Sequence, residues 1–138
     1  MKKTDILVIG TGLAGAISAI IAADNNKKVT IITKTDDIIS GSTAAAQGGI
    51  IYRGIDDASE KLINDIMLAG AGHCWEPAVS QLAIWGPKLV VELLINRFKI
   101  NFDKSENNDF DLTAEGAHSI RRIIHSKDLT GRDRKSVV

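Results

Sequence analysis

The segment "GTGLAG", Gly10 to Gly15, has the residue types and spacing needed to hold the phosphates of a dinucleotide. It follows the apolar run Ile6–Ile9 and opens an alanine-rich segment, so it joins a predicted strand to a predicted helix. Gly10 permits a tight turn, Gly12 lets the backbone approach a pyrophosphate, and Gly15 lets the helix pack on the strand. The N–H groups that begin the helix would face the phosphates. Glycines that merely turn the chain are the alternative. The candidate cofactor-binding residues here are Gly10, Thr11, Gly12, Leu13, Ala14 and Gly15.

A second candidate position follows the next apolar run, where Thr33 and Lys34 stand. Folds that bind dinucleotides usually place Asp or Glu there, to hydrogen-bond the adenosine ribose. A lysine suits the 2′-phosphate of NADP instead, and a solvated surface lysine is the other alternative. Lys34 is therefore a candidate cofactor-binding residue with both alternatives open.

The stretch "GSTAAAQGG", Gly41 to Gly49, combines small side chains with two hydroxyls and an amide. Small side chains let the backbone N–H groups approach a ligand closely, and the polar side chains add hydrogen bonds. We expect a ligand-binding loop rather than a helix, with an ordinary tight turn as the alternative. The candidate residues are Ser42, Thr43, Ala44, Ala45, Ala46, Gln47, Gly48 and Gly49.

The pattern of apolar residues predicts the elements that must position these loops. Strands at 6–9 and 29–32, buried on both faces, flank a helix at 13–23 and form a βαβ unit, which implies a parallel sheet. The predicted fold class is therefore α/β, Rossmann-like. The later elements are a strand at 49–52, a helix at 57–69, a helical stripe from Pro77 ended by Gly86-Pro87, a helix at 89–95 and a strand at 98–102.

Composition limits the classes of function. The 138 residues include 17 basic and 17 acidic side chains, so we expect no nucleic-acid partner. The single cysteine, Cys74, fits a reducing compartment, and no metal site is predicted. No apolar run approaches the roughly 20 residues that cross a bilayer. We expect a soluble cytoplasmic protein without a membrane partner.

Taken together, "ILVIGTGLAG", "ITK", "GSTAAAQGGI" and "AGAG" resemble the flavoprotein subunits of the succinate dehydrogenase and fumarate reductase family, which includes the aspartate oxidases. The resemblance implies a Rossmann-like FAD-binding domain in which Ser42 to Gly49 lies along the flavin. Respiratory members carry the flavin covalently on a histidine at the start of this loop. Ser42 stands there, so the resemblance implies non-covalent FAD and the aspartate oxidase branch.

The segment "LTAEGAHSIRRIIHSKDLTGR", Leu112 to Arg132, is similar to an aspartate oxidase segment. By that match Glu115 is the catalytic-site glutamate near the amino group of the substrate. A carboxylate attracts an ammonium and separates aspartate from succinate, which lacks one. His118 faces a ligand or has a structural role. Arg121 and Arg122 would lie on opposite faces of a strand, so at most one meets a ligand.

Some residues depart from this pattern. Ala44 and Ala45 are smaller than the residues usual in aspartate oxidases and resemble the respiratory branch. Ala117 replaces a glycine, which could shift the substrate loop. The ending "DRKSVV", residues 133–138, departs altogether. We expect it to be a non-native tail, since one reading frame of a common sequencing adapter would encode these six residues.

The resemblance implies oxidation of L-aspartate to iminoaspartate with FAD, in the first step of bacterial NAD synthesis. Electrons would pass to O2 or fumarate, and quinolinate synthase would be the partner that consumes the imine. Residues 1–132 would be the N-terminal part of the FAD-binding domain. The resemblance implies that the capping and C-terminal helical domains, with the remaining catalytic groups, would lie outside these residues, so the chain alone is expected to be inactive. The alternatives are a fumarate reductase or succinate dehydrogenase flavoprotein and a non-catalytic nucleotide-binding remnant.

Overall fold

The structure is a computed structural model that describes residues 3–38 and 41–126. These residues divide into two compact units. The first comprises 3–38 and 41–47, and the second comprises 48–126. The expected non-native tail, 133–138, lies outside the described residues.

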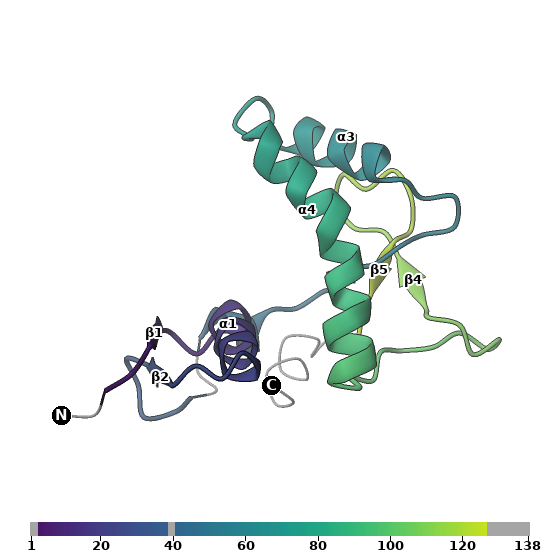
Figure 1. The fold of residues 1–138 in the computed structure, drawn as a ribbon. Helices are drawn as coiled ribbons and strands as arrows, with labels where there is room; N and C mark the ends of the chain where they lie inside the picture. Colours follow the sequence, from purple (N-terminus) through teal and green to yellow (C-terminus); the bar gives the residue numbers. More distant parts are fainter. Residues whose placement is uncertain (1–2, 39–40, 127–138) are drawn as a thin grey trace. The chain divides into compact units, whose positions relative to one another are not determined.

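The first unit contains the expected βαβ arrangement. Strands β1 (Ile6–Ile9) and β2 (Val29–Ile32) are parallel and in register, with Ile6 opposite Val29. Helix α1 (Leu13–Asp24) connects them and lies against both strands (Figure 1). Short β-branched runs favour the two strands, and the alanine-rich segment favours the helix. The parallel pair and the α/β fold class are confirmed.

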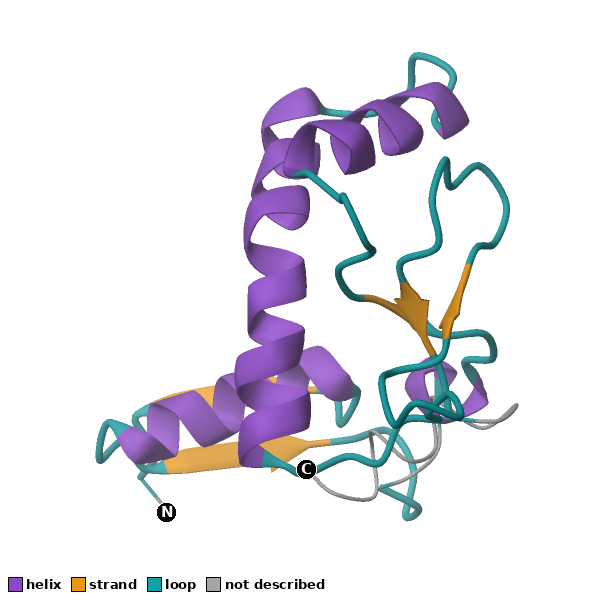
Figure 2. Cartoon of the chain, turned by 90° about the vertical axis from the view of Figure 1, so that its right-hand side faces the viewer, coloured by secondary structure: helices purple, strands orange, loops and turns teal. Residues whose placement is uncertain are grey.

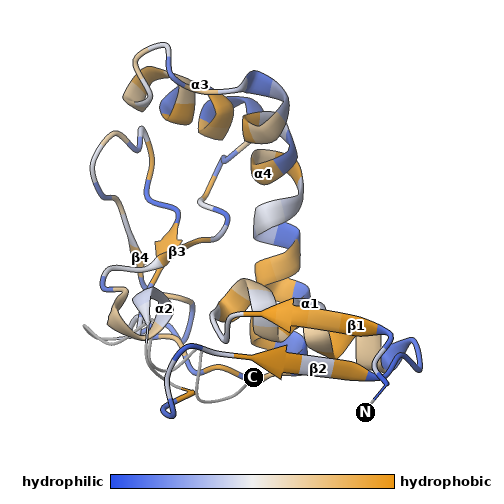
Figure 3. Ribbon diagram, turned by 90° about the vertical axis from the view of Figure 1, so that its left-hand side faces the viewer, coloured by the Kyte–Doolittle hydropathy of each residue, from blue (hydrophilic) through white to orange (hydrophobic). Residues whose placement is uncertain are grey.

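Burial of the first strand on both faces was a wrong expectation. Leu7 is 53% exposed and Ile9 is 80% exposed. Figure 3 shows β1 and β2 as largely apolar ribbons. Among the described residues of this unit α1 packs against both strands, and the exposure of Leu7 and Ile9 shows that β1 is not covered on both faces.

Part of the stretch from Gly41 to Gly49 is helical, which the sequence analysis did not expect. Helix α2 (Ser42–Ala45) is a single turn that follows Gly41, whose φ is 119°. The Gly41 carbonyl accepts hydrogen bonds from the N–H groups of both Ala44 and Ala45. Alanine has the highest helix propensity, so the three small residues that suggested a loop also permit this turn.

The second unit has an antiparallel sheet that was not anticipated. Its strands are β3 (Ile50–Ile51), β4 (Leu112–Thr113) and β5 (Ile123–Ile124), in the order β3-β5-β4. Helices α3 (Ser59–Ala69) and α4 (Glu76–Leu89) pack against each other (Figure 1). The buried apolar side chains of this unit include Leu62, Val79, Ala83, Val90, Leu94, Ile100, Phe102, Ile123 and Ile124.

The predicted helix break at Gly86-Pro87 is wrong. Helix α4 passes through Pro87 and continues as the π-helix η1 (Val90–Arg97), so Figure 2 shows one unbroken helix. Proline has no N–H to donate to the carbonyl four residues earlier. Helix α4 nonetheless includes Pro87, and wider hydrogen bonding occurs in the segment after it, as in the 2.8 Å bond from the Phe98 N–H to the Leu93 carbonyl.

The predicted strand at 98–102 is also wrong, because this segment is irregular. The Ile100 N–H instead donates to the Leu94 carbonyl at 2.9 Å. Ile100 and Phe102 are both buried. The alternation of apolar residues therefore marked burial without strand pairing.

The continuous helix formed by α4 and η1 bears on the expectation that no segment of the chain crosses a membrane. Residues Glu76–Arg97 form 22 helical residues, long and apolar enough to cross a bilayer by length and composition. The sequence alone predicts no such segment. Val79, Ala83, Pro87, Val90 and Leu94 are buried at helical spacing, which is typical of a helix packed against protein. The absence of a membrane partner stays a prediction.

Candidate functional site

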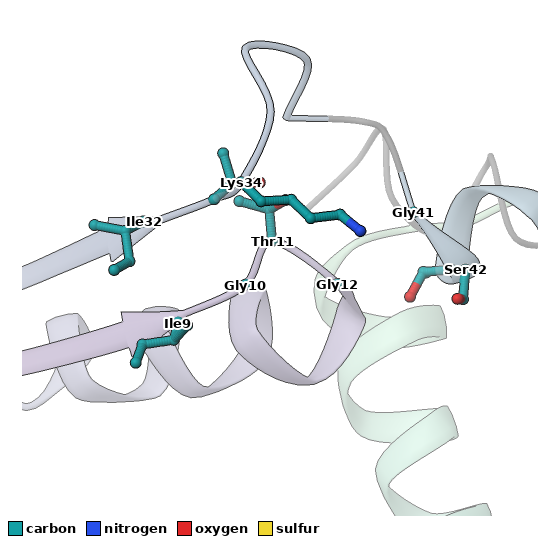
Figure 4. A pocket seen from close by; sticks show the side chains of 10 residues that line it. Ile9, Gly10, Thr11, Gly12, Ile32, Lys34, Gly41 and Ser42 are labelled. Carbon is teal, nitrogen blue, oxygen red and sulfur yellow. The ribbon is translucent and has the colours of Figure 1, made fainter.

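A cleft of about 540 Å³ lies at the carboxyl ends of β1 and β2 (Figure 4). Open parallel sheets bind ligands at this edge. The cleft is lined by Ile9, Gly10, Thr11, Gly12, Ile32, Thr33, Lys34, Gly41, Ser42 and Thr43. Six of the predicted cofactor residues are thus brought together: Gly10, Thr11, Gly12, Lys34, Ser42 and Thr43. The others do not line it, namely Leu13, Ala14, Gly15, Ala44, Ala45, Ala46, Gln47, Gly48 and Gly49.

The three motif glycines have the geometry that the motif requires. Gly10 has φ of 108°, a backbone conformation that residues with a side chain rarely adopt. Gly12 caps α1 in extended conformation without a side chain of its own to occupy the cleft. A Cβ on Gly15 would run into the Gly10 carbonyl oxygen and crowd Val8, so glycine is needed for α1 to approach β1.

Thr43 has a role that sequence reasoning missed. Its Oγ1 accepts a hydrogen bond from the Leu13 N–H at 3.2 Å, so it satisfies one of the unpaired donors at the start of α1. A Cβ on Gly12 would lie 3.2 Å from the same oxygen. Thr43 therefore connects the stretch 41–47 to the glycine motif. No local sequence pattern indicates this contact, because 30 residues separate Thr43 from Leu13.

Lys34 is the charged residue among the described residues that line the cleft. Figure 4 shows its side chain extending past Thr11 toward the segment that carries Gly41 and Ser42. A cation here, together with the start of α1, favours an anionic ligand.

A second pocket, of about 300 Å³, lies within the second unit. It is lined by Asp65, Ile66, Ala69, Glu115, Gly116, Ala117 and His118. Glu115 is exposed and begins a turn in which the His118 N–H donates to the Glu115 carbonyl at 3.1 Å. Gly116 takes the positive φ of 52° in this turn. Ala117 does not have positive φ, so its methyl group causes no backbone strain there.

Gly48 lies directly beside Glu115. Gly48 has φ of 70°, and a Cβ added to it would be 3.0 Å from each oxygen of the Glu115 carboxylate. Gly48 and Glu115, which belong to two different sequence motifs, are therefore neighbours in space. The stretch 41–49 ends against the carboxylate that was predicted to meet the substrate.

Arg122 forms a buried network that the sequence analysis did not foresee. Its side chain is 0% exposed, and its Nε lies 3.1 Å from Asp57 Oδ2. Its Nη1 lies 2.5 Å from Asp65 Oδ2 and 3.2 Å from His118 Nδ1. Arg121 is exposed, which agrees with opposite faces for the two arginines. Arg122 is thus paired with acids, while Arg121 faces solvent.

The network changes the acidity of Asp65. Burial raises the pKa of this carboxyl, but hydrogen bonds from the Ser119 backbone, Arg122 and the Ser119 hydroxyl outweigh burial and hold it below 3.8. The contribution of Asp65 to the free energy of unfolding is therefore fully present when the pH is above the ordinary pKa of an aspartate. It is lost as the pH falls through the lower pKa of Asp65 in the folded state. We expect Asp65→Asn to reduce the acid dependence of the urea midpoint, measured by tryptophan fluorescence. The exposed control Asp109→Asn should retain the wild-type slope. Equal slopes in wild type and Asp65→Asn would contradict this assignment.

A second prediction concerns Gly15. The methyl group of Gly15→Ala would overpack the contact between α1 and β1, so we expect a loss of about 1–3 kcal/mol in the free energy of unfolding. Urea unfolding followed by circular dichroism measures it. Ser18→Ala, on the exposed side of the same helix, should change this free energy by less than about 0.5 kcal/mol. Equal effects of the two substitutions would refute the packing role.

Comparison with known families identifies the family of the chain. Residues 5–135 match the family described as FAD binding domain. The chain belongs to this family. The predicted cofactor, FAD, is thereby confirmed, and the cation at Lys34 no longer needs the 2′-phosphate of NADP as its explanation.

This FAD-binding domain has relatives with a more specific name. It is 40% identical over 131 residues to an L-aspartate oxidase of Clostridium acetobutylicum, and 38% identical over 134 residues to one of Mycobacterium leprae. Both alignments cover 94% of this chain, but 29% and 25% of the relatives. The chain spans about a quarter of the length of the curated relatives it matches.

Solved structures confirm the fold. The FAD-binding domain is similar to the Mycobacterium smegmatis Sdh1 complex in the apo form, with a TM-score of 0.88 and 25% identity. It is also similar to E. coli quinol fumarate reductase, with a TM-score of 0.87 and 24% identity. Each similarity covers 97% of this chain and 23% of the other.

The residues of the cleft fit part of FAD. Gly10 and Gly12 leave the start of α1 without side chains, and Lys34 supplies a positive charge. The pyrophosphate carries the negative charges that both features favour. The roles of individual residues remain predictions.

Proposed function

We propose that this chain is the N-terminal part of an FAD-dependent oxidase that converts L-aspartate to iminoaspartate. The observation that carries the proposal is the Glu115 carboxylate, which lines a pocket and lies against Gly48 at the end of the predicted flavin loop. Its similarity to L-aspartate oxidases over 94% of the chain supports the same function.

The chemistry divides between cofactor and protein. FAD, when bound, supplies the acceptor for the two electrons that leave the substrate. The start of α1 and Lys34 bind and orient its phosphates. Glu115 holds the α-ammonium of L-aspartate through a charge-assisted hydrogen bond, so succinate, which lacks this group, is disfavoured. The electrons then pass to O2 or fumarate. The enzyme is cytoplasmic, and quinolinate synthase consumes its unstable imine product.

The same proposal includes non-covalent FAD. Ser42 lines the cleft where respiratory relatives would present a histidine, and a serine cannot form that imidazole linkage. A respiratory flavoprotein is the second candidate, favoured by the similarity to the Sdh1 complex and by the small residues Ala44 and Ala45. Flavin that stays with acid-precipitated protein would favour the second candidate, and flavin released to the supernatant the first.

Activity is tested in a chimera, because this chain spans about a quarter of its relatives. Residues 1–126 would replace the matching segment of the Clostridium acetobutylicum enzyme. We expect L-aspartate to yield one ammonia, from hydrolysis of the imine, for each acceptor molecule reduced. A folded chimera that binds FAD but releases no ammonia would refute the proposal, whereas the isolated chain is expected to be inactive.

A further inference from the structure

Arg122 contacts His118, a histidine that lines the same pocket as Glu115. Its Nη1 lies 3.2 Å from His118 Nδ1. A guanidinium has donors and no acceptor, so this contact is a hydrogen bond when Nδ1 offers its lone pair. The proton of the neutral imidazole then lies on Nε2.

The other edge of the His118 ring is available to the pocket. His118 is half-buried and lines the pocket together with Glu115. Its Nε2 has no hydrogen bond to any of the described residues. In the tautomer with the proton on Nε2, the turn 115–118 presents an N–H donor and a carboxylate acceptor.

The same arginine anchors the end of this turn. Asp65 Oδ2, which pairs with Arg122 Nη1, also accepts hydrogen bonds from the Ser119 N–H and the Ser119 hydroxyl, each at 2.9 Å. Asp57 holds the Nε of the guanidinium at 3.1 Å. Asp57 precedes α3 and Asp65 lies within it, so the α3 segment fixes the arginine and the arginine fixes the turn.

We propose that Arg122 is a positioning residue that holds His118 in the Nε2–H tautomer and, through Asp65, keeps the 115–119 segment in place. The pocket then offers a donor for the carboxylate and an acceptor for the ammonium of the same α-amino acid. This assignment of the ligand rests on the proposed function. The tautomer and the anchoring rest on the contacts alone.

The test is to observe the histidine nitrogens of the full chain directly by NMR. The chain has three histidines, so labelling with ¹⁵N-histidine gives few signals, and His73→Gln and His125→Gln assign two of them. We expect wild-type His118 to show one tautomer, with an unprotonated Nδ1 and a protonated Nε2. A protonated Nδ1 in the neutral ring would overturn the proposal.

Two variants test whether Arg122 is the cause. Arg122→Lys keeps the charge but loses the planar fork, and we expect the His118 nitrogen shifts to move toward those of a mixture of tautomers. Asp65→Asn should move them in the same direction, while the His73 shifts stay at their wild-type values. Unchanged His118 shifts in these variants would overturn the proposal. No ligand is present in these spectra, so failure of the tautomer leaves the proposed function standing, and a chimera without activity leaves the tautomer result standing.

Discussion

Replacement of Glu115 by Gln is expected to lower kcat/KM for L-aspartate by about 10- to 100-fold in the chimera, the loss that a hydrogen bond to a charged group predicts. The glutamine retains the size of the side chain and removes the charge that attracts the α-ammonium. Steady-state ammonia release measures the effect. Because Glu115 is exposed and not part of the buried network, the substitution should leave the fold intact.

Glu106→Gln is the matched control, since Glu106 is also exposed but does not line the pocket. It should leave kcat/KM at the wild-type value. If Glu115→Gln retains full activity while its fold and FAD content are normal, Glu115 does not contact the substrate. The amino-group recognition that separates the two branches would then have to lie elsewhere.

Replacement of Arg122 by Met is expected to lower the free energy of unfolding of the second unit by about 3–5 kcal/mol. The cause is the loss of the partner of two carboxylates, of which Asp57 is 3% and Asp65 is 11% exposed at the side chain. Both tryptophans, Trp75 and Trp85, lie in this unit, so urea unfolding followed by fluorescence reports it.

Two controls separate charge from packing. The neighbouring Arg121→Met, at an exposed position, should change the free energy of unfolding by less than about 0.5 kcal/mol. Adding Asp57→Asn and Asp65→Asn to Arg122→Met should restore part of the loss, because no uncompensated charge then stays buried. If the triple variant is less stable than Arg122→Met alone, the network contributes through contacts other than charge pairing.

The first unit was predictable because its signals are local. The run Ile6–Ile9, the glycines and the alanine-rich segment lie next to one another, and each motif glycine has a geometric need that the spacing already implied. The helical turn Ser42–Ala45 was missed because alanines permit both a close backbone approach and a helix. The exposure of β1 was not predicted because the apolar residues of a strand do not show whether both of its faces are covered.

The second unit was harder because its decisive contacts are long-range. Arg122 meets Asp65 across 57 residues, and no local pattern pairs them. One signal was present: Asp65 lies three residues after Leu62, on the apolar side of the helix at 59–69, where an acid needs a partner. Pro87 suggested a break, but the chain is helical through Pro87 and on into the π-helix.

Oxidation of L-aspartate by bound FAD is tested by the rate of flavin reduction in the chimera, recorded without oxygen as the loss of flavin absorbance after mixing with substrate. We expect rapid bleaching by L-aspartate, and bleaching by succinate at least about 10-fold slower, because only L-aspartate has the ammonium that Glu115 binds. Bleaching by succinate as fast as by L-aspartate, or none by L-aspartate, would contradict this expectation.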